Sequence, residues 1–247
     1  MNSLFNLNNK TILVTGASSG IGSSISEMLA AQNATVIMTA RNEERLNGLL
    51  NTLVKGNHRF HTTDLTSSDQ IHQLVSNLPE LDGVILNAGI VKTVPVQFIK
   101  KDDLDYMFNL MLHSSILLIQ QLIKNKKLKP ESSVCFISSV ASQKITIGNA
   151  MYSAAKGALN SFTKSLALEL APKRIRVNAI LPGMVQTAIL NSGTISDEQL
   201  ELHLKNYPLG RFGKPEDVAG LTVYLMSDIS KWMTGSLLTI DGGYTLK

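Results

Sequence analysis

The chain has 247 residues, of which 44% are hydrophobic and 17% charged, and its formal net charge is +4. This length and composition exclude a disordered chain and favour one folded α/β domain over residues 1–247. The only dense basic cluster, at 124–129, contains no aromatic side chain on which a base could stack, so we expect no nucleic-acid partner.

Short apolar runs alternate with helical patterns along the whole chain. The run at 11–16 leads into a helix with Ile21, Ile25 and Leu29 on one face, and a second run follows at 34–40, which predicts a strand, a helix and a strand. The alternation continues with a helix around 46–53, a strand near 59–64, a helix around 71–78, a strand at 82–89, a long helix from 102 to about 125, a strand at 133–139, a helix around Tyr152, a strand at 175–183, a helix at 215–226 and a strand at 236–243. About seven strands that are apolar on both sides predict a doubly wound parallel sheet with helices on both faces.

Other residue types argue against several kinds of site or location. Cys135 lies in an apolar run with no evident cationic neighbour, which predicts a buried, inert thiol, and a single cysteine allows no disulfide within the chain. The five histidines show no metal-ligand spacing, so no metal site is expected. The N-terminus has no basic segment followed by a long apolar core, and the stretch 110–123 is too short and too polar to span a bilayer, so we expect no membrane partner and a cytoplasmic location.

The first strand runs into the sequence TGASSGIG, which places Gly16, Gly20 and Gly22 where a helix must begin. A helix N-terminus presents unpaired N–H groups and the positive end of a dipole, so a pyrophosphate can bind there. The G-x-x-x-G-x-G spacing departs from the common G-x-G-x-x-G fingerprint, and an ordinary tight turn is the alternative. Its position after the first strand of a strand–helix–strand unit favours a cofactor site.

The sequence MYSAAKG at 151–157 places Tyr152 and Lys156 four positions apart. On a helix this spacing puts both side chains on one face. A nearby cation favours the phenolate form of a tyrosine, so the pair predicts a phenol whose proton moves easily. A surface pair without chemistry is the alternative.

Taken in order, these motifs resemble those of the short-chain dehydrogenase/reductase family. The resemblance rests on TGASSGIG, LNAG at 86–89, Ser139, YSAAK, PGMVQT at 182–187, GRFGKPEDVA and TGSLLTIDGG, and Ser139 precedes Tyr152 by the thirteen positions usual in the family. It spans nearly the whole chain. It implies a Rossmann fold whose site lies above the carboxyl ends of the strands, and hydride transfer between a nicotinamide cofactor and a carbonyl or alcohol.

The resemblance also implies four catalytic residues. Tyr152 is the general acid in reduction, and Lys156 binds the nicotinamide ribose and lowers the pKa of the phenol. Ser139 donates a hydrogen bond to the carbonyl oxygen, which becomes more negative as hydride arrives. Asn109 holds a water that links Lys156 to solvent, although an asparagine in a helix can also be purely structural.

For the cofactor, the resemblance implies that Asp64 caps the adenine, that 87–89 lines a ribose and that Thr187 binds the carboxamide. Asp64 can alternatively be a helix N-cap. Arg41 follows the second strand where an NAD-selective enzyme has an acid, so we expect it to accept the 2′-phosphate of NADP(H), although Ser19 stands where many NADP-preferring members have a basic residue. The expected cofactor-binding residues are Gly16, Ser18, Ser19, Gly20, Ile21, Gly22, Arg41, Asp64, Leu65, Asn87, Ala88, Gly89, Tyr152, Lys156, Pro182, Gly183, Val185 and Thr187.

Within the family the chain looks most similar to the 3-oxoacyl-acyl-carrier-protein (ACP) reductases. The segment 188–207 is the family's variable lid, so a reductase of a sugar, steroid or other small carbonyl is the alternative, and a catalytically idle NADP-binding sensor or scaffold is a lesser one. Lys127 or Lys129, together with Lys173, match the basic residues that dock the acidic carrier protein, but lysines at helix ends also complement helix dipoles. Family members are usually tetramers, and the helix 102–125 is a candidate seam, so we expect a homo-oligomer.

Overall fold

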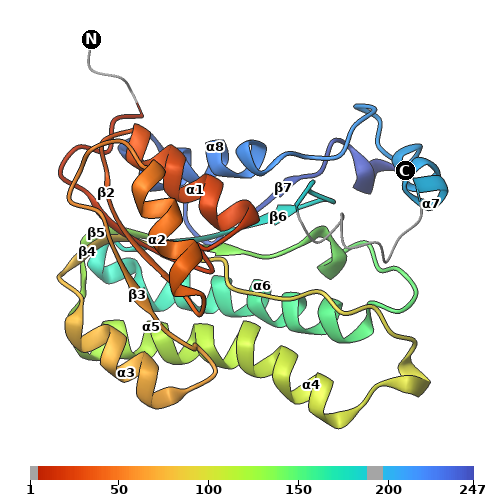
Figure 1. Cartoon of the computed structure of the whole chain (residues 1–247), viewed down its shortest axis with the longest axis horizontal. Helices are drawn as coiled ribbons and strands as arrows, with labels where there is room; N and C mark the ends of the chain where they lie inside the picture. The colour runs from red at the N-terminus through yellow and green to blue at the C-terminus, as the bar shows by residue number, and fades with distance from the viewer. Residues whose placement is uncertain (1–4, 188–196) are drawn as a thin grey trace.

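The computed structural model describes residues 5–187 and 197–247, and Figure 1 shows the path of the chain. Within these residues, seven strands form one sheet in the order β3-β2-β1-β4-β5-β6-β7, and every neighbouring pair is parallel. The strands are β1 (Thr11–Thr15), β2 (Thr35–Ala40), β3 (Arg59–Thr62), β4 (Leu81–Leu86), β5 (Leu128–Ile137), β6 (Arg176–Pro182) and β7 (Leu237–Ile240). The predicted α/β class and the sheet of about seven parallel strands are confirmed.

Helices cover both faces of the sheet, as predicted (Figure 1). Helices α1 and α8 pack against each other on one face, and α3 packs against α5 on the other, where α6 also lies. The α-helices are α1 (Gly20–Ala31), α2 (Glu43–Thr52), α3 (Ser68–Asn77), α4 (Lys101–Phe108), α5 (Ser114–Lys124), α6 (Ala150–Leu170), α7 (Asp197–Leu204) and α8 (Pro215–Met226).

The strands form two hydrophobic cores because successive side chains point to opposite faces. In β1, Leu13 joins the core beneath α3, α5 and α6, whereas Ile12 and Val14 join the core beneath α1, α2 and α8. Cys135 in β5 belongs to the second core and is fully buried, and burial raises the pKa of its thiol to about 12. The predicted inert cysteine is therefore confirmed.

The long helix expected from 102 to about 125 is interrupted. A π-helical turn, η2 (Asn109–His113), separates α4 from α5, and the N–H of Ser114 donates to the carbonyl of Asn109, five residues back. A π turn of this kind inserts one residue and rotates the faces on either side of it relative to each other. The helical pattern in the sequence could not show this insertion, because apolar residues continue through it.

The combined run Lys101–Lys124 is long and apolar enough to cross a membrane by length and composition. The expectation of no span applies to the shorter stretch 110–123, which is only part of this run. Half of its most apolar window is buried inside the fold, and a core helix meets the same criterion, so the finding is weak support for a membrane span.

The strand order reverses direction between β1 and β4, which lie side by side although β2 and β3 come between them in the chain. In doubly wound sheets the loops that leave such a pair diverge to opposite faces and open a crevice at the carboxyl edge. The expected site residues that follow β1, β4, β5 and β6 therefore meet at one edge of the sheet.

Candidate active site

The turn between β1 and α1 depends on glycines. Gly16 and Gly20 have φ of +64° and +58°, where side chains are disfavoured, and a Cβ on Gly16 would lie 2.8 Å from the Cα of Ala88. A Cβ on Gly22 would overlap the carbonyl oxygen of Gly16. The first turn of α1 has no acidic residue, and its N-cap Ser19 makes no side-chain cap hydrogen bond. Helices α2 and α3, in contrast, each have an acidic residue in the first turn and a side-chain cap hydrogen bond. The N-terminus of α1 therefore fits an anionic pyrophosphate.

Thr15, which the sequence interpretation missed, ties the ends of β1 and β4 together. Its buried hydroxyl accepts from the N–H groups of Asn87 and Ala88 at 3.0 and 3.1 Å. The Asn87 side chain donates to the carbonyls of Thr15 and Gly16 at 3.2 and 3.1 Å. Asn87 thus supports the glycine turn, because its side-chain NH₂ group donates both of these hydrogen bonds to the backbone of the turn. A hydroxyl residue at the last position of a buried strand is the signal that could have identified Thr15.

Tyr152 and Lys156 lie on one face of α6, as their spacing predicts. The Tyr152 phenol lies near Ser139, which follows β5, and the Ser139 side chain lowers the pKa of that phenol. The Lys156 ammonium lies 5.7 Å from the centroid of the Tyr152 ring and donates to the carbonyl of Ile137 at 2.7 Å. Three of the four expected catalytic side chains therefore meet at the carboxyl end of β5.

Burial dominates the pKa values of this group. Burial raises the pKa of Tyr152, and the Ser139 side chain lowers it only in part. Burial lowers the pKa of Lys156 to about 8, because a buried ammonium loses its hydration. Burial is therefore the larger effect on both groups in this arrangement, and the expected lowering of the phenol pKa by Lys156 stays a prediction.

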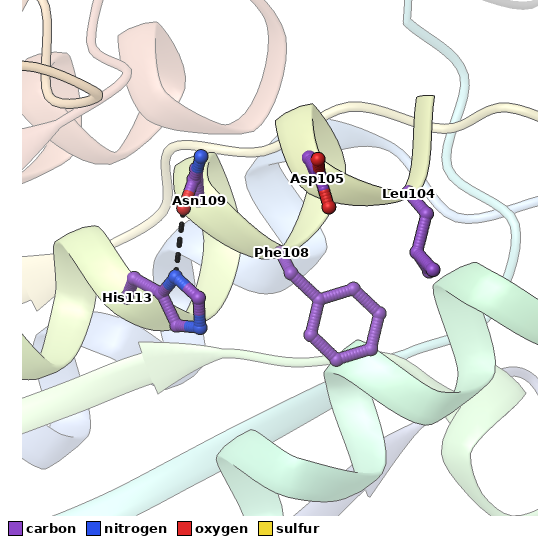
Figure 2. Close-up of a pocket in the computed structure, with 5 residues that line it drawn as sticks. All are labelled: Leu104, Asp105, Phe108, Asn109 and His113. Carbon is purple, nitrogen blue, oxygen red and sulfur yellow. Dashed lines mark hydrogen bonds between the residues drawn. The ribbon is translucent and has the colours of Figure 1, made fainter. Parts of the chain in front are cut away.

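The Asn109 side chain does not reach Lys156. Figure 2 shows Asn109 and His113 one turn apart on the helix, and the Asn109 Oδ1 lies 2.7 Å from the His113 Nδ1. Both side chains are exposed and line a cavity of about 340 Å³ with Leu104, Asp105 and Phe108. The π turn packs on α6. Because the Asn109 side chain is bonded to His113, the Asn109 backbone carbonyl is left to hold a water that links Lys156 to solvent, and this role of Asn109 stays a prediction.

Arg41 lies beside the expected adenine site. Its Nη1 donates to the Tyr106 hydroxyl at 2.7 Å, and its positive charge contributes to lowering the pKa of Asp64. Burial raises that pKa, but hydrogen bonds from Thr66 and the charge of Arg41 outweigh it. The Asp64 carboxylate accepts from the Thr66 N–H and hydroxyl, whereas α3 is capped by Ser67. The alternative that Asp64 is the N-cap is therefore wrong.

The segment 182–187 is held between the glycine turn and the region after α7. A Cβ on Gly20 would lie 3.2 Å from the Thr187 methyl group, and Val185 forms a bridge with Gly213. The Met184 N–H donates to the Tyr207 hydroxyl at 3.0 Å. Tyr207 also stacks on Tyr244, a support that the sequence interpretation did not identify. The rest of the expected lid, 188–196, lies outside the described residues.

The basic residues expected to dock a carrier protein lie at the wrong edge within one subunit. Helices run antiparallel to the strands they cover, so the ends of α5 and α6 lie at the amino edge of the sheet, opposite Ser139 (Figure 1). Lys129 pairs with Asp82 at 2.9 Å, and Lys127 donates to the Leu78 carbonyl. Their expected position beside the mouth of the site is corrected accordingly.

Among residues 5–187 and 197–247, no group of three or more His, Cys, Asp and Glu side chains gathers as a metal site would.

Comparison with known proteins agrees with this geometry. A family model described as "Enoyl-(Acyl carrier protein) reductase" matches residues 16–245. The chain is 34% identical over 240 residues to the 3-oxoacyl-[acyl-carrier-protein] reductase FabG of Rickettsia bellii, covering 97% of this chain and 98% of that protein. It is 32% identical over 246 residues to the FabG of Thermotoga maritima, covering 97% and 99%.

Solved structures show the same fold. A short chain dehydrogenase family protein from Francisella tularensis is 35% identical, with a TM-score of 0.84 over 96% of this chain and 99% of that one. The short-chain dehydrogenase/reductase of Serratia marcescens is 29% identical, with a TM-score of 0.89 over 97% and 99%. The chain belongs to the short-chain dehydrogenase/reductase family, whose members are oxidoreductases that use a nicotinamide cofactor.

Proposed function

We propose that this oxidoreductase uses NADPH to reduce a carbonyl to a secondary alcohol, and that its substrate is a 3-oxoacyl group carried on ACP in the cytoplasm. The observation that carries the proposal is the meeting of Ser139, Tyr152 and Lys156 at the end of β5: the Ser139 side chain acts on the Tyr152 phenol, and the Lys156 ammonium lies 5.7 Å from the phenol ring. It places two hydroxyl groups side by side at the edge of the sheet that also holds the glycine turn.

The two hydroxyls would bind one carbonyl oxygen. NADPH supplies the hydride when it is bound. Ser139 donates a hydrogen bond to the oxygen as negative charge grows on it, and Tyr152 donates the proton that completes the alcohol. The raised pKa of Tyr152 keeps the phenol protonated at neutral pH, as a general acid must be. The Lys156 ammonium then compensates the phenolate that is left behind.

The remaining expected residues surround the space for the cofactor. The uncapped N-terminus of α1 would receive the pyrophosphate, and Ala88, Gly89 and 182–187 would line the nicotinamide half. Lys156 also lies close to this space, because a Cβ on Gly89 would be 3.8 Å from its Nζ.

Arg41 supports the choice of NADPH, since its exposed guanidinium donates one ordering hydrogen bond, to the Tyr106 hydroxyl, and forms no ion pair among the described residues. We expect Arg41→Ala to lower the ratio of kcat/KM for NADPH over NADH by about tenfold, because a charge-assisted contact with the 2′-phosphate is lost. Arg45→Ala, an exposed arginine on α2, is the matched control. An unchanged ratio in Arg41→Ala contradicts the 2′-phosphate role.

Support for an acyl substrate comes from the relatives' names and from the surface near the site. Val96, Phe98, Ile145 and Ile147 are exposed by 69%, 62%, 61% and 95%. Their two loops are joined by a hydrogen bond from the Val94 N–H to the Gly148 carbonyl at 2.8 Å. Exposed apolar side chains gathered in one place are typical of binding surfaces, and these fit an acyl chain.

The deciding experiment measures NADPH oxidation with acetoacetyl-ACP, an acetoacetyl thioester of a small carrier, a panel of sugar, steroid and small ketones, and crotonyl-ACP. We expect the highest kcat/KM with acetoacetyl-ACP. A higher value with a small ketone overturns the acyl substrate, and turnover of crotonyl-ACP alone assigns enoyl reduction. NADPH binding without turnover of any substrate identifies a sensor or scaffold.

A further inference from the structure

A second cavity lies at the amino edge of the sheet, at the end of β6 opposite Gly183. Its volume is about 620 Å³, which is in the range of small-molecule sites. Four segments line it: the start of β5, the end of α6, the start of β6 and the turn before β7. Its lining residues are Glu131, Ala171, Arg174, Ile175, Arg176, Lys231, Trp232 and Thr234.

The lining of this cavity carries three cations and one carboxylate. Arg174 pairs with Glu131 at 2.9 Å. Lys231 lies 3.5 Å from Asp228, whose other carboxylate oxygen already pairs with Lys10 at 2.6 Å. The positive charge of the lining is therefore only partly compensated by the protein.

Arg176 is the unusual member of this group. It is only 8% exposed, and its Nη2 donates to the carbonyls of Leu225 and Ser227 at 2.8 and 3.4 Å. Its Nη1 is buried and has no hydrogen-bond partner within residues 5–187 and 197–247, and no carboxylate of that part of the chain pairs with the guanidinium. Asp228 acts on this buried charge only at a distance, and its carboxylate already pairs with Lys10 and Lys231, so the guanidinium is incompletely compensated and the lining favours an anion in the cavity.

Trp232 supplies the second kind of contact. Its side chain is fully exposed, and it is the only tryptophan of the chain. The buried Ile175 adds apolar surface to the same cavity. An exposed indole beside cations is suited to a ligand that is flat and apolar at one end and anionic at the other.

We propose that this cavity is a second binding site, separate from the reductase site, for a small organic anion with a flat aromatic body. The anionic group faces Arg174, Arg176 and Lys231, and the ring packs on Trp232 and Ile175. A second copy of the chain is the competing occupant. Two-fold pairing at this place would bring the same three cations of both copies together, which repel each other, so the structure favours the small anion.

Trp232 allows binding to be measured without enzyme activity. We titrate the full chain with benzoate, benzamide and acetate and follow the Trp232 fluorescence, with saturating NADPH in a parallel series. We expect a saturable change with benzoate in both series, and binding about tenfold weaker for benzamide and acetate, because each lacks one of the two features that the cavity recognises. Equal, non-saturable changes for all three compounds overturn the proposal.

Charge variants locate the site. Arg174→Gln/Lys231→Gln changes two exposed side chains, so the fold is retained, and we expect benzoate to bind about tenfold more weakly to it. Lys164→Gln, an exposed lysine of α6 outside the cavity, is the matched control. Unchanged affinity in the double variant overturns the proposal. So does a Trp232 spectrum that changes with protein concentration alone, since that outcome assigns the cavity to a second copy of the chain.

Discussion

At the scale of single residues, the candidate site combines groups that gain their chemistry from burial. Tyr152 and Lys156 both have shifted pKa values, in the directions that make each more readily neutral. Such shifts are typical of functional sites, because burial and neighbouring charges there adjust the pKa of each group to its catalytic task.

Replacement of Tyr152 by Phe removes only the hydroxyl that donates the proton. We expect kcat to fall by at least about a hundredfold, the usual contribution of general acid catalysis, while the NADPH dissociation constant stays within about a factor of two. Tyr224→Phe, in α8 on the other face of the sheet, is the control and keeps its kcat. Steady-state kinetics and NADPH titration measure both quantities, and a Phe variant with half the parent kcat contradicts the assignment.

Lys156→Met tests the cost of the buried ammonium. The pKa of Lys156 falls from 10.5 in the unfolded chain to about 8, so below pH 8 the charge destabilises the fold by about 3 kcal/mol. The variant loses the hydrogen bond to Ile137, worth about 1 kcal/mol, so we expect it to be inactive but more stable at pH 7 by about 2 kcal/mol.

The pH dependence of that difference has a defined sign. Between pH 8 and 10.5 the unfolded parent binds more protons than the folded parent, so the parent gains stability as pH rises and its disadvantage shrinks. Urea unfolding at pH 7 and pH 10 measures the gap. Lys164→Met, an exposed lysine of the same helix, is the control, and a Lys156→Met variant less stable than the parent at pH 7 contradicts the prediction.

At the scale of elements, the site depends on where strands end and helices begin. The first strand, the glycine turn and the helix after it were predictable, because apolar periodicity and glycines mark them directly. The π turn at 109–113 was not, since it is marked by backbone bonds such as that from the Ser114 N–H to the Asn109 carbonyl and leaves the apolar pattern unchanged. The role of Thr15 was also hidden, because its partners lie more than seventy residues away.

Alanine substitutions of two helical glycines, Gly22 in α1 and Gly48 in α2, distinguish a steric clash in the glycine turn from the general gain in helix propensity that alanine brings. Gly22→Ala would overlap the Gly16 carbonyl, so we expect a loss of stability of about 2 kcal/mol or more and a weakened NADPH affinity. Gly48→Ala in α2 meets nothing within 4 Å, so we expect it to be more stable by about 0.5–1 kcal/mol with unchanged NADPH affinity. Urea unfolding and cofactor titration test both substitutions. Equal effects of the two on stability and on NADPH affinity contradict the role of the glycine turn in binding the cofactor.

At the scale of the whole molecule, the placement of the basic helix ends raises the question of subunit pairing. Ile116 on α5 and Leu168 on α6 are exposed by 37% and 79% on the outer helix face. If two copies pair by this face around a two-fold axis across the helices, the basic end of one subunit lies over the site edge of the other. We expect the parent to be an oligomer, and Ile116→Asp/Leu168→Asp to be a monomer by light scattering. A monomeric parent contradicts this pairing.

If the subunits pair in this way, docking of ACP by the basic helix ends requires the oligomer. In the oligomer, Lys129→Glu/Lys173→Glu should lower kcat/KM for acetoacetyl-ACP by about tenfold and leave that for a small thioester unchanged. In the monomeric variant the same charge reversal should have no effect on either substrate. An equal loss with both substrates would show that these lysines act on stability and not on docking.

The sequence by itself determined the sheet, the glycine turn, the Tyr152–Lys156 face and the family, because these features follow from local periodicity and from spacings within single elements. Only the tertiary structure decided that Asn109 bonds to His113, that Asn87 supports the Gly16 turn and that the lysines at 127, 129 and 173 lie at the far edge. The direction of the Tyr152 pKa belongs to the same group. Each of these depends on burial or on contacts between segments distant along the chain, and no local pattern of residues encodes either.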